Sequence, residues 1–405
     1  MKKILALFSI SLPFLVNAQG FQVSLQGQKQ QAMAGAGTAL MTDGSSLFYN
    51  PGGVSFLKEN SFSAGVSPVI SRGSFVDGPS STVSETKSPV SYPFTAYLVL
   101  GKKSSKLKYG IAAYTPFGST IDWQAGWTGR FILTHLQLQS VYVQPTISYK
   151  LSDKIGIGAG FVYGIGRVNL QRDIPVVDNS GNYGHAELKG DAKGYGFNAG
   201  IYYTPSTNFS LGFTYRSQVD MELEKGKATF TVPASLASNF PSGNFSTTLP
   251  LPSIMTLGMS YTASSKLTLA FDANRIGWKT FDTLTFDYEN NTAQLQDTRE
   301  ARNYKNATAL RLGAEYRMTE KFAARAGIKY LMTPVQDGYV TPDVPDANHF
   351  NYSAGFGYKI SHRFGVDASF TFEQMTRTDN SVETGLSGTY KTNLFIPGIS
   401  LNYNF

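Results

Sequence analysis

The sequence has 405 residues, including 40 Gly, 28 Phe and 23 Tyr but no Cys, and its mean hydropathy is −0.16. No run of about 20 apolar residues follows the N-terminal segment, which excludes a helical membrane protein, and the lack of Cys excludes disulfides. The formal net charge of +7 is scattered without a basic tract, so we expect no nucleic-acid partner. Abundant aromatic residues with only 16% charged residues are typical of a transmembrane β-barrel, whose strands alternate between lipid-facing and lumen-facing side chains.

The N-terminus has the pattern of a secretory signal. Lys2 and Lys3 form a basic start, residues 4–16 form an apolar core, and Val16-Asn17-Ala18 is a suitable cleavage site before Gln19. An uncleaved anchor helix is the alternative, but the apolar run is short for one. We therefore expect residues 1–18 to be removed on export.

The next segment, residues 19–57, is too rich in Gly, Ala and Gln to form a membrane strand. It ends in Asn50-Pro51-Gly52-Gly53, which is a tight turn because Asn, Pro and Gly each favour turn conformations. Residues 58–405 read instead as amphipathic strands. We therefore expect residues 19–57 to be a hatch that plugs a barrel formed by residues 58–405. Phe48 and Tyr49 are candidates for the floor of a ligand pocket, and packing of the hatch against the wall is the alternative role.

The strands show strict alternation of apolar and polar residues, as period-two side-chain geometry requires. In one strand Phe350, Tyr352 and Phe356 alternate with Asn351 and Ser353. The same pattern would fit a soluble sandwich with its apolar face inward. The chain ends in an alternating strand with a terminal Phe405, which resembles the last strand of outer-membrane barrels.

The lengths of the connections favour the membrane barrel, because outer-membrane barrels have short turns on one side and long loops on the other. Short turns are expected near residues 102–106, 152–154, 205–208, 263–266, 319–321 and 361–363. Long polar loops are expected near residues 73–88, 117–131, 173–190, 220–249, 280–304, 334–348 and 375–387. The count predicts an all-β barrel of fourteen antiparallel strands with both mature termini in the periplasm.

One strand departs from simple alternation. Residues 155–167 place Gly156, Gly158 and Gly160 on one wall, which either relieves crowding or leaves room for the hatch or a ligand. The third strand ends in Thr115-Pro116-Phe117-Gly118. Proline cannot donate to a ladder, so this stretch is either an ordinary strand end or an unpaired segment that opens a lateral gap in the wall.

No catalytic or metal site is indicated by the sequence. The four His residues, His135, His185, His349 and His362, lie on different strand ends and loops without a triad pattern or metal-ligand spacing. We therefore expect no enzyme activity, no cofactor and no metal.

The order of several short motifs resembles the FadL-type long-chain fatty acid transporters of bacterial outer membranes, including the related aromatic-hydrocarbon uptake porins. The resembling stretches are Gly20-Phe21-Gln22, Gly35-Ala36-Gly37, Asn50-Pro51, Trp127-Thr128-Gly129-Arg130, Gly196-Phe197-Asn198-Ala199-Gly200 and Leu312-Gly313-Ala314-Glu315-Tyr316-Arg317. Gly52 stands where the family motif has Ala. The resemblance covers nearly the whole mature chain.

The resemblance implies passive, energy-independent passage of hydrophobic molecules through a monomer surrounded by outer-membrane lipids. The ligand would reach an apolar pocket above the hatch and leave through a gap at the kinked third strand, here Pro116, Phe117 and Gly118. Arg172 corresponds to the family's head-group Arg. The family's second basic residue has no clean equivalent; Arg299 and Arg302 flank its place, which Glu300 occupies.

Long-chain fatty acids are the ligand that we expect. Aromatic hydrocarbons, another apolar ligand such as haem, and general porin function remain the alternatives. A general porin needs no plug, so the hatch disfavours that last reading.

Overall fold

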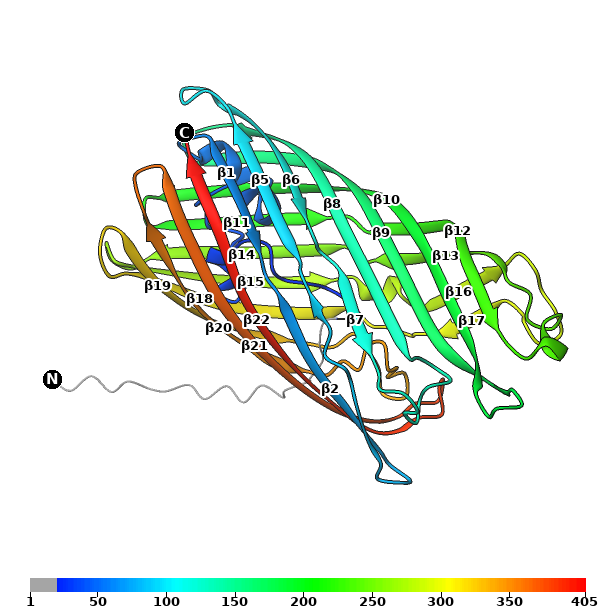
Figure 1. Cartoon of the computed structure of the whole chain (residues 1–405). Helices are drawn as coiled ribbons and strands as arrows, with labels where there is room; N and C mark the ends of the chain where they lie inside the picture. Colours follow the sequence, from blue (N-terminus) through cyan, green and yellow to red (C-terminus); the bar gives the residue numbers. More distant parts are fainter. Residues whose placement is uncertain (1–19) are drawn as a thin grey trace.

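The computed structural model describes residues 20–405, so the expected signal, residues 1–18, lies outside the described residues. Every strand joins one closed antiparallel barrel of fourteen spanning strands, several of them interrupted (Figure 1). Closure occurs at β1, where Phe62 pairs with Leu98 of β5 on one side and with Tyr403 of β22 on the other. The predicted fold class and strand number are therefore confirmed. Within the described residues, no helix has the length and apolar character needed to cross a membrane.

The spanning strands follow one another in chain order around the barrel. They are β1–β2 (Ser61–Val66, Val69–Asp77), β3–β5 (Val83–Glu85, Val90–Ser91, Phe94–Leu100), β6–β7 (Leu107–Tyr114, Gly118–Asp122), β8 (His135–Lys150), β9 (Ile155–Val177), β10 (Tyr183–Ser206), β11–β12 (Phe209–Arg216, Val219–Thr231), β13–β14 (Gly243–Leu251, Ile254–Thr262), β15–β16 (Leu267–Ile276, Thr283–Tyr288), β17–β18 (Thr298–Ala301, Ala307–Arg317), β19 (Phe322–Leu331), β20 (His349–Lys359), β21 (Phe364–Asn380) and β22 (Ser387–Asn404). Two short 3-10 helices, η2 (Ala234–Leu236) and η3 (Trp278–Thr280), lie in the connections.

Strand faces show that the apolar side points outward. On β20 the side chains of Phe350 and Tyr352 are 44% and 54% exposed, whereas Asn351 and Ser353 are buried inside the barrel. A soluble sandwich would bury the aromatic face instead. The outer face of the barrel is therefore suited to contact lipid.

All six short turns fall where they were expected, for example between Lys150 of β8 and Ile155 of β9. The prediction of long polar loops is partly wrong, because several of these segments are continuous β-hairpins. The segment expected to be a loop at residues 173–190 is mostly strand, with β9 reaching Val177 and β10 starting at Tyr183.

Those extended hairpins share a second apolar core. The buried side chains are Ile174, Ala186, Leu188, Leu223, Ala228, Phe245, Phe286, Tyr288 and Leu295. A transmembrane strand needs only about 9–11 residues, and β9 has 23, so this core lies beyond the bilayer. Figure 1 shows β12, β13, β16 and β17 reaching past the other strands at this end.

The chain before β1 lies inside the barrel as a compact hatch (Figure 1). It contains α1 (Gln28–Gln31), α2 (Ser46–Tyr49) and the 3-10 helix η1 (Pro51–Phe56). Glycines of the wall make room for it: a Cβ at Gly158 would lie 2.3 Å from the carbonyl oxygen of Pro51, and one at Gly156 would lie 2.3 Å from that of Gly52. At these two positions the missing side chains accommodate the plug.

Candidate functional site

A cavity of about 360 Å³ lies between the first residues of the hatch and the wall. Its volume is at the lower end of the range of small-molecule sites, about 300–1,000 Å³. Most of its surface is apolar, with contributions from Phe21, Phe94, Ile121, Trp123, Leu138, Met375, Leu394 and Ile396. Such a cavity suits a hydrophobic ligand with few polar groups.

One wall of this cavity is charged. Lys329 of β19 lies 3.5 Å from the carboxylate of Glu373 on β21, and His349 of β20 lies 3.2 Å from the other oxygen of that carboxylate. Asp346, in the connection between β19 and β20, also lines the cavity. The cavity therefore has one polar region in an apolar surround.

The barrel wall beside the cavity is interrupted at the third strand. β6 ends at Tyr114, and β7, which starts at Gly118, pairs only with β8 among the named strands. Towards the second strand, backbone hydrogen bonds join Thr115 to Phe94 and Lys87 to Asp122. Within the described chain, no backbone hydrogen bond joins residues 88–93 to residues 116–121.

We call this unpaired stretch the window. Ser91 and Thr120 face each other across it through a hydroxyl contact of 3.0 Å. Tyr92, 67% exposed, stands at its outer edge and also lines the cavity. The window therefore lies between the cavity and the lipid side of the wall.

The first residues of the hatch close the window from inside. The N–H of Val23 donates to the carbonyl of Pro116 at 2.8 Å, and the N–H of Gly118 donates to the carbonyl of Phe21 at 3.0 Å. These bonds take the place of the hydrogen bonds that a paired strand would make on this side of the third strand. They are important because an unsatisfied backbone group in a membrane costs roughly several kcal/mol. We call residues 20–25 the gate segment.

The gate segment is tethered at its start. The N–H of Gly20 donates to Oδ2 of Asp346 at 2.7 Å, and the hydroxyl of Thr333 donates to the same oxygen at 3.0 Å. Burial raises the pKa of Asp346, an effect that His349 and the bond from Gly20 partly offset. Gly20 has φ +65°, and a Cβ there would lie 2.7 Å from the ring of Trp278, so a side chain is excluded.

The predicted hatch turn is an anchor. Asn50 Oδ1 accepts from the N–H of Gly52 at 3.0 Å, and its Nδ2 donates to the carbonyls of Thr38 and Ile201, each at 3.0 Å. A Cβ at Gly52 would lie 2.5 Å from the carbonyl oxygen of Gly200. Asn50, Pro51 and Gly52 therefore hold the hatch firmly against β9 and β10.

The structure does not bring the five candidate ligand residues together. Arg172 is half-buried on β9, opposite Ala186, and is not part of the cavity lining. Phe48 and Tyr49 line a separate cavity of about 40 Å³.

The two other candidates lie on β17 and directly after it. Arg299 is exposed on β17. Arg302 is buried between Glu300 at 2.8 Å and Asp343 at 3.1 Å, where burial lowers its pKa but the two carboxylates raise it above the ordinary value. Its contacts are those of a residue that clamps the loop carrying Asp343.

Sequence reasoning missed the charged wall of the cavity. Lys329, Asn351 and Glu373 form one row across β19, β20 and β21, since Lys329 pairs with Asn351 and Asn351 pairs with Glu373. Their signal was present as charged or polar residues at inward positions, but only the register between strands shows that they meet.

The family model described as "Outer membrane protein transport protein (OMPP1/FadL/TodX)" matches residues 10–405. A putative outer membrane protein of Neisseria meningitidis is 26% identical over 96% of this chain and 95% of its own. The long-chain fatty acid transport protein of an Escherichia coli O6:H1 strain is 21% identical over 93% of this chain and 91% of its own. The 47 kDa outer membrane protein of Pasteurella multocida is 24% identical, but the match spans about half of either chain, 54% and 52%.

Solved structures show the same fold. A Pseudomonas aeruginosa FadL homologue superposes with a TM-score of 0.84 at 20% identity, covering 96% of this chain and 100% of that one. The Pseudomonas putida toluene transporter TodX superposes with a TM-score of 0.73 at 15% identity, covering 96% and 99%. The hatch-plugged barrel and the match over almost the whole chain lead to one conclusion: this chain belongs to the FadL/TodX family of outer-membrane transporters of hydrophobic compounds.

Proposed function

We propose that this protein carries hydrophobic molecules, long-chain fatty acids foremost, passively across the outer membrane. The molecules leave sideways through the window in the barrel wall. The observation that carries the proposal is the position of the cavity: its lining includes the gate segment and residues on both sides of the window, among them Ser91 and Thr120. To reach the lipid, a ligand in the cavity would pass the gate segment and the Ser91–Thr120 contact across the window. The short-turn end, which carries the C-terminus, faces the periplasm in this proposal, whereas Gly20 lies against Asp346 of the long β19–β20 connection, and one barrel suffices.

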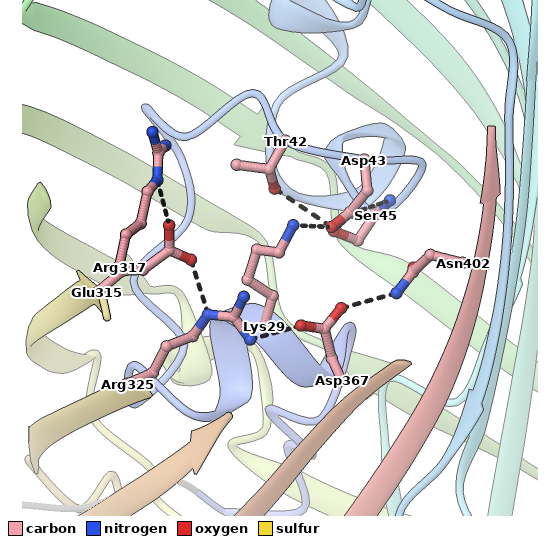
Figure 2. A network of polar contacts seen from close by, with 9 residues as sticks. All are labelled: Lys29, Thr42, Asp43, Ser45, Glu315, Arg317, Arg325, Asp367 and Asn402. Carbon is pink, nitrogen blue, oxygen red and sulfur yellow. Dashed lines mark hydrogen bonds and ion pairs between the residues drawn. The ribbon is translucent and has the colours of Figure 1, made fainter. Parts of the chain in front are cut away.

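A polar network favours this lateral route over the barrel axis (Figure 2). In the hatch Lys29 pairs with Asp43 at 3.2 Å, and in the wall Arg325 pairs with Glu315 at 2.8 Å and also with Asp367. The wall residues lie near the short turns at the ends of β18, β19 and β21. A hydrophobic ligand moving along the axis would have to break these contacts without replacing them, which is costly in a buried site.

Aromatic hydrocarbons are the second candidate ligand. Trp123 lines the cavity and stacks on Trp127 with ring centroids 4.2 Å apart, and Phe75 and Tyr390 surround the pair. Such an aromatic wall also packs well against a flat ring. TodX, one of the structural neighbours, is described as a toluene transporter.

A reversible lock across the window tests the route. Because the chain has no Cys, a Ser91→Cys/Thr120→Cys pair can form a single disulfide where the two hydroxyls now touch at 3.0 Å. In a strain lacking the native protein, we expect oxidation to abolish uptake of a labelled long-chain fatty acid and reduction to restore it. Uptake of a small hydrophilic sugar should not depend on the protein.

The matched control is Thr378→Cys/Thr389→Cys, which bridges the paired strands β21 and β22, where the hydroxyls lie 2.8 Å apart. Its uptake should not respond to oxidation. Fatty-acid uptake through an oxidised window would refute the lateral route. Equal dependence of the sugar on the protein would replace the proposal with porin function, and a response to toluene alone would favour the aromatic ligand.

A further inference from the structure

The charged wall of the cavity contains fixed, paired charges. His349 shows this most clearly, because its Nδ1 lies 2.9 Å from the carbonyl oxygen of Ala347 and its Nε2 lies 3.2 Å from Oε2 of Glu373. Both partners are acceptors, so both ring nitrogens must carry hydrogen to make these bonds. A ring that donates from both nitrogens is an imidazolium, with a positive charge.

Each positive charge that faces this wall lies near a negative charge. Lys329 and His349 are positive, and Glu373 and Asp346 are negative. The next strand, β18, contributes Arg311, which lies directly opposite Asp272 on β15. Asp343, the remaining acid of the lining, is paired with Arg302 at 3.1 Å. Among the described residues that face the cluster, each positive charge therefore has a negative counterpart.

We infer that the cavity selects amphiphiles whose head group is uncharged: a hydroxyl, an ester, an amide or a protonated carboxylic acid. This inference rests on the proposed function and narrows its ligand class. An ionised head would bring an unmatched charge out of water, which is unfavourable unless a partner is supplied. A neutral polar head can exchange hydrogen bonds with the cluster without disturbing its balance.

The form in which a fatty acid is carried follows from this selection. It enters the cavity with its carboxyl group protonated, and its chain lies along the apolar lining towards the window. Carboxyl groups of this kind ionise near pH 4.3, roughly, so the carried form becomes rarer as pH rises. Uptake of a fatty acid then falls with rising pH, while uptake of the matching alcohol does not.

Tryptophan fluorescence gives a direct test with the full chain in lipid nanodiscs. The protein has three Trp residues, Trp123, Trp127 and Trp278, and all are buried inside the barrel. A brominated chain in the lipid therefore stays away from them, whereas one in the cavity quenches Trp123. The probes are the ω-bromo derivatives of dodecanol, dodecanoate and dodecylammonium at neutral pH, and Trp123→Phe identifies the cavity signal.

We expect dodecanol to quench at concentrations about tenfold lower than either ion, a difference of one decade in affinity. Lys329→Met, which removes one positive charge and keeps an apolar side chain of similar length, should shift the preference. Dodecylammonium should then gain about tenfold, dodecanoate should lose, and dodecanol should change little. Lys227→Met, at an exposed position on β12, removes the same charge as the matched control and should leave all three unchanged.

The outcomes separate the two proposals. Tight binding of dodecanoate at neutral pH with no change in Lys329→Met would overturn the inference and leave hydrophobic uptake intact. No quenching by any probe, in protein that keeps its heat-modifiable mobility on gels, would count against both the inference and the proposed function.

Discussion

Asp272 and Arg311 lie opposite each other on the neighbouring strands β15 and β18, and both bind the same turn of the hatch. Oδ2 of Asp272 accepts from the N–H groups of Gly37 at 2.9 Å and Thr38 at 3.0 Å, and from the Thr38 hydroxyl at 2.8 Å. Arg311 donates to the carbonyl of Gly35 at 3.0 Å. The wall thus binds the donors and the acceptor of one turn, which explains how a plug with little secondary structure stays seated.

The Asp272→Asn variant should loosen the hatch. The amide keeps the volume but weakens the three charge-assisted bonds, each of which contributes about 1.5–3 kcal/mol. We expect single-channel recordings in planar bilayers to show frequent open events that the unaltered protein lacks. Asp191→Asn, at an exposed pair with Arg167, is the control. Equal recordings for both variants would mean that other contacts seat the turn.

Replacement of Asp346 tests the tether of the gate segment. Asp346→Ala removes the acceptor for the N–H of Gly20 and so releases the gate segment. Uptake of a hydrophobic antibiotic should then rise about 3-fold or more. Asp346→Asn keeps an acceptor oxygen and should resemble the unaltered protein. A similar rise in both variants would show that the charge, and not the acceptor, holds the tether.

The pH dependence of Asp346 has a defined sign. Because burial raises its pKa, its contribution to stability is present below the ordinary carboxyl value and is lost as pH rises through the folded value. The Asn variant has no charge to bury. At neutral pH it should therefore melt no lower than the unaltered protein, as calorimetry in detergent can measure.

The Lys29–Asp43 pair predicts acid sensitivity of the hatch. Burial alone would raise the pKa of Asp43, but Lys29 and the bonds from Ser45 hold it below the ordinary value of 3.8. Its stabilisation is therefore present above that value and is lost as pH falls through the lower folded pKa. The pKa of Lys29 is lowered by burial but raised overall by Asp43 and Asp367, so its contribution is lost only as pH rises above 10.5.

Channel recordings at stepwise lower pH measure this loss. We expect leak events to appear only in strong acid for the unaltered protein and at neutral pH for Asp43→Asn. Asp153→Asn, in an exposed turn pair with Lys150, should behave as the unaltered protein does. A leak that is independent of Asp43 would place the acid-sensitive contact elsewhere.

Local sequence patterns were sufficient to predict the barrel and its hatch. Alternation such as that of Phe350 to Asn351 sets which face meets lipid, and the composition of residues 19–57 excludes a strand. The hairpins at residues 173–190 and 220–249 were misjudged, because polar residues at exposed positions conceal a shared apolar core. Ile174 and Phe245 are buried because their strands pack together, so neither strand alone explains why these positions are apolar.

The sequence did not predict the cavity or its charged wall. Lys329 and Glu373 are separated by two strand connections, and only the register through Asn351 brings them together. The tether of Gly20 to Asp346 spans 326 residues and involves a backbone N–H, which no side-chain pattern reports. Contacts of this kind depend on barrel closure, so the sequence around Pro116 does not show which residues fill the wall there.

The apolar core shared by the long hairpins limits where this protein can vary. Ile174, Leu188 and Phe245 are buried there, so substitutions would disturb several hairpins at once. The tip at residues 178–182 is exposed throughout and contacts none of that core. Sequence changes and an inserted affinity tag would be accommodated at this tip, while the hairpins below it keep their shape.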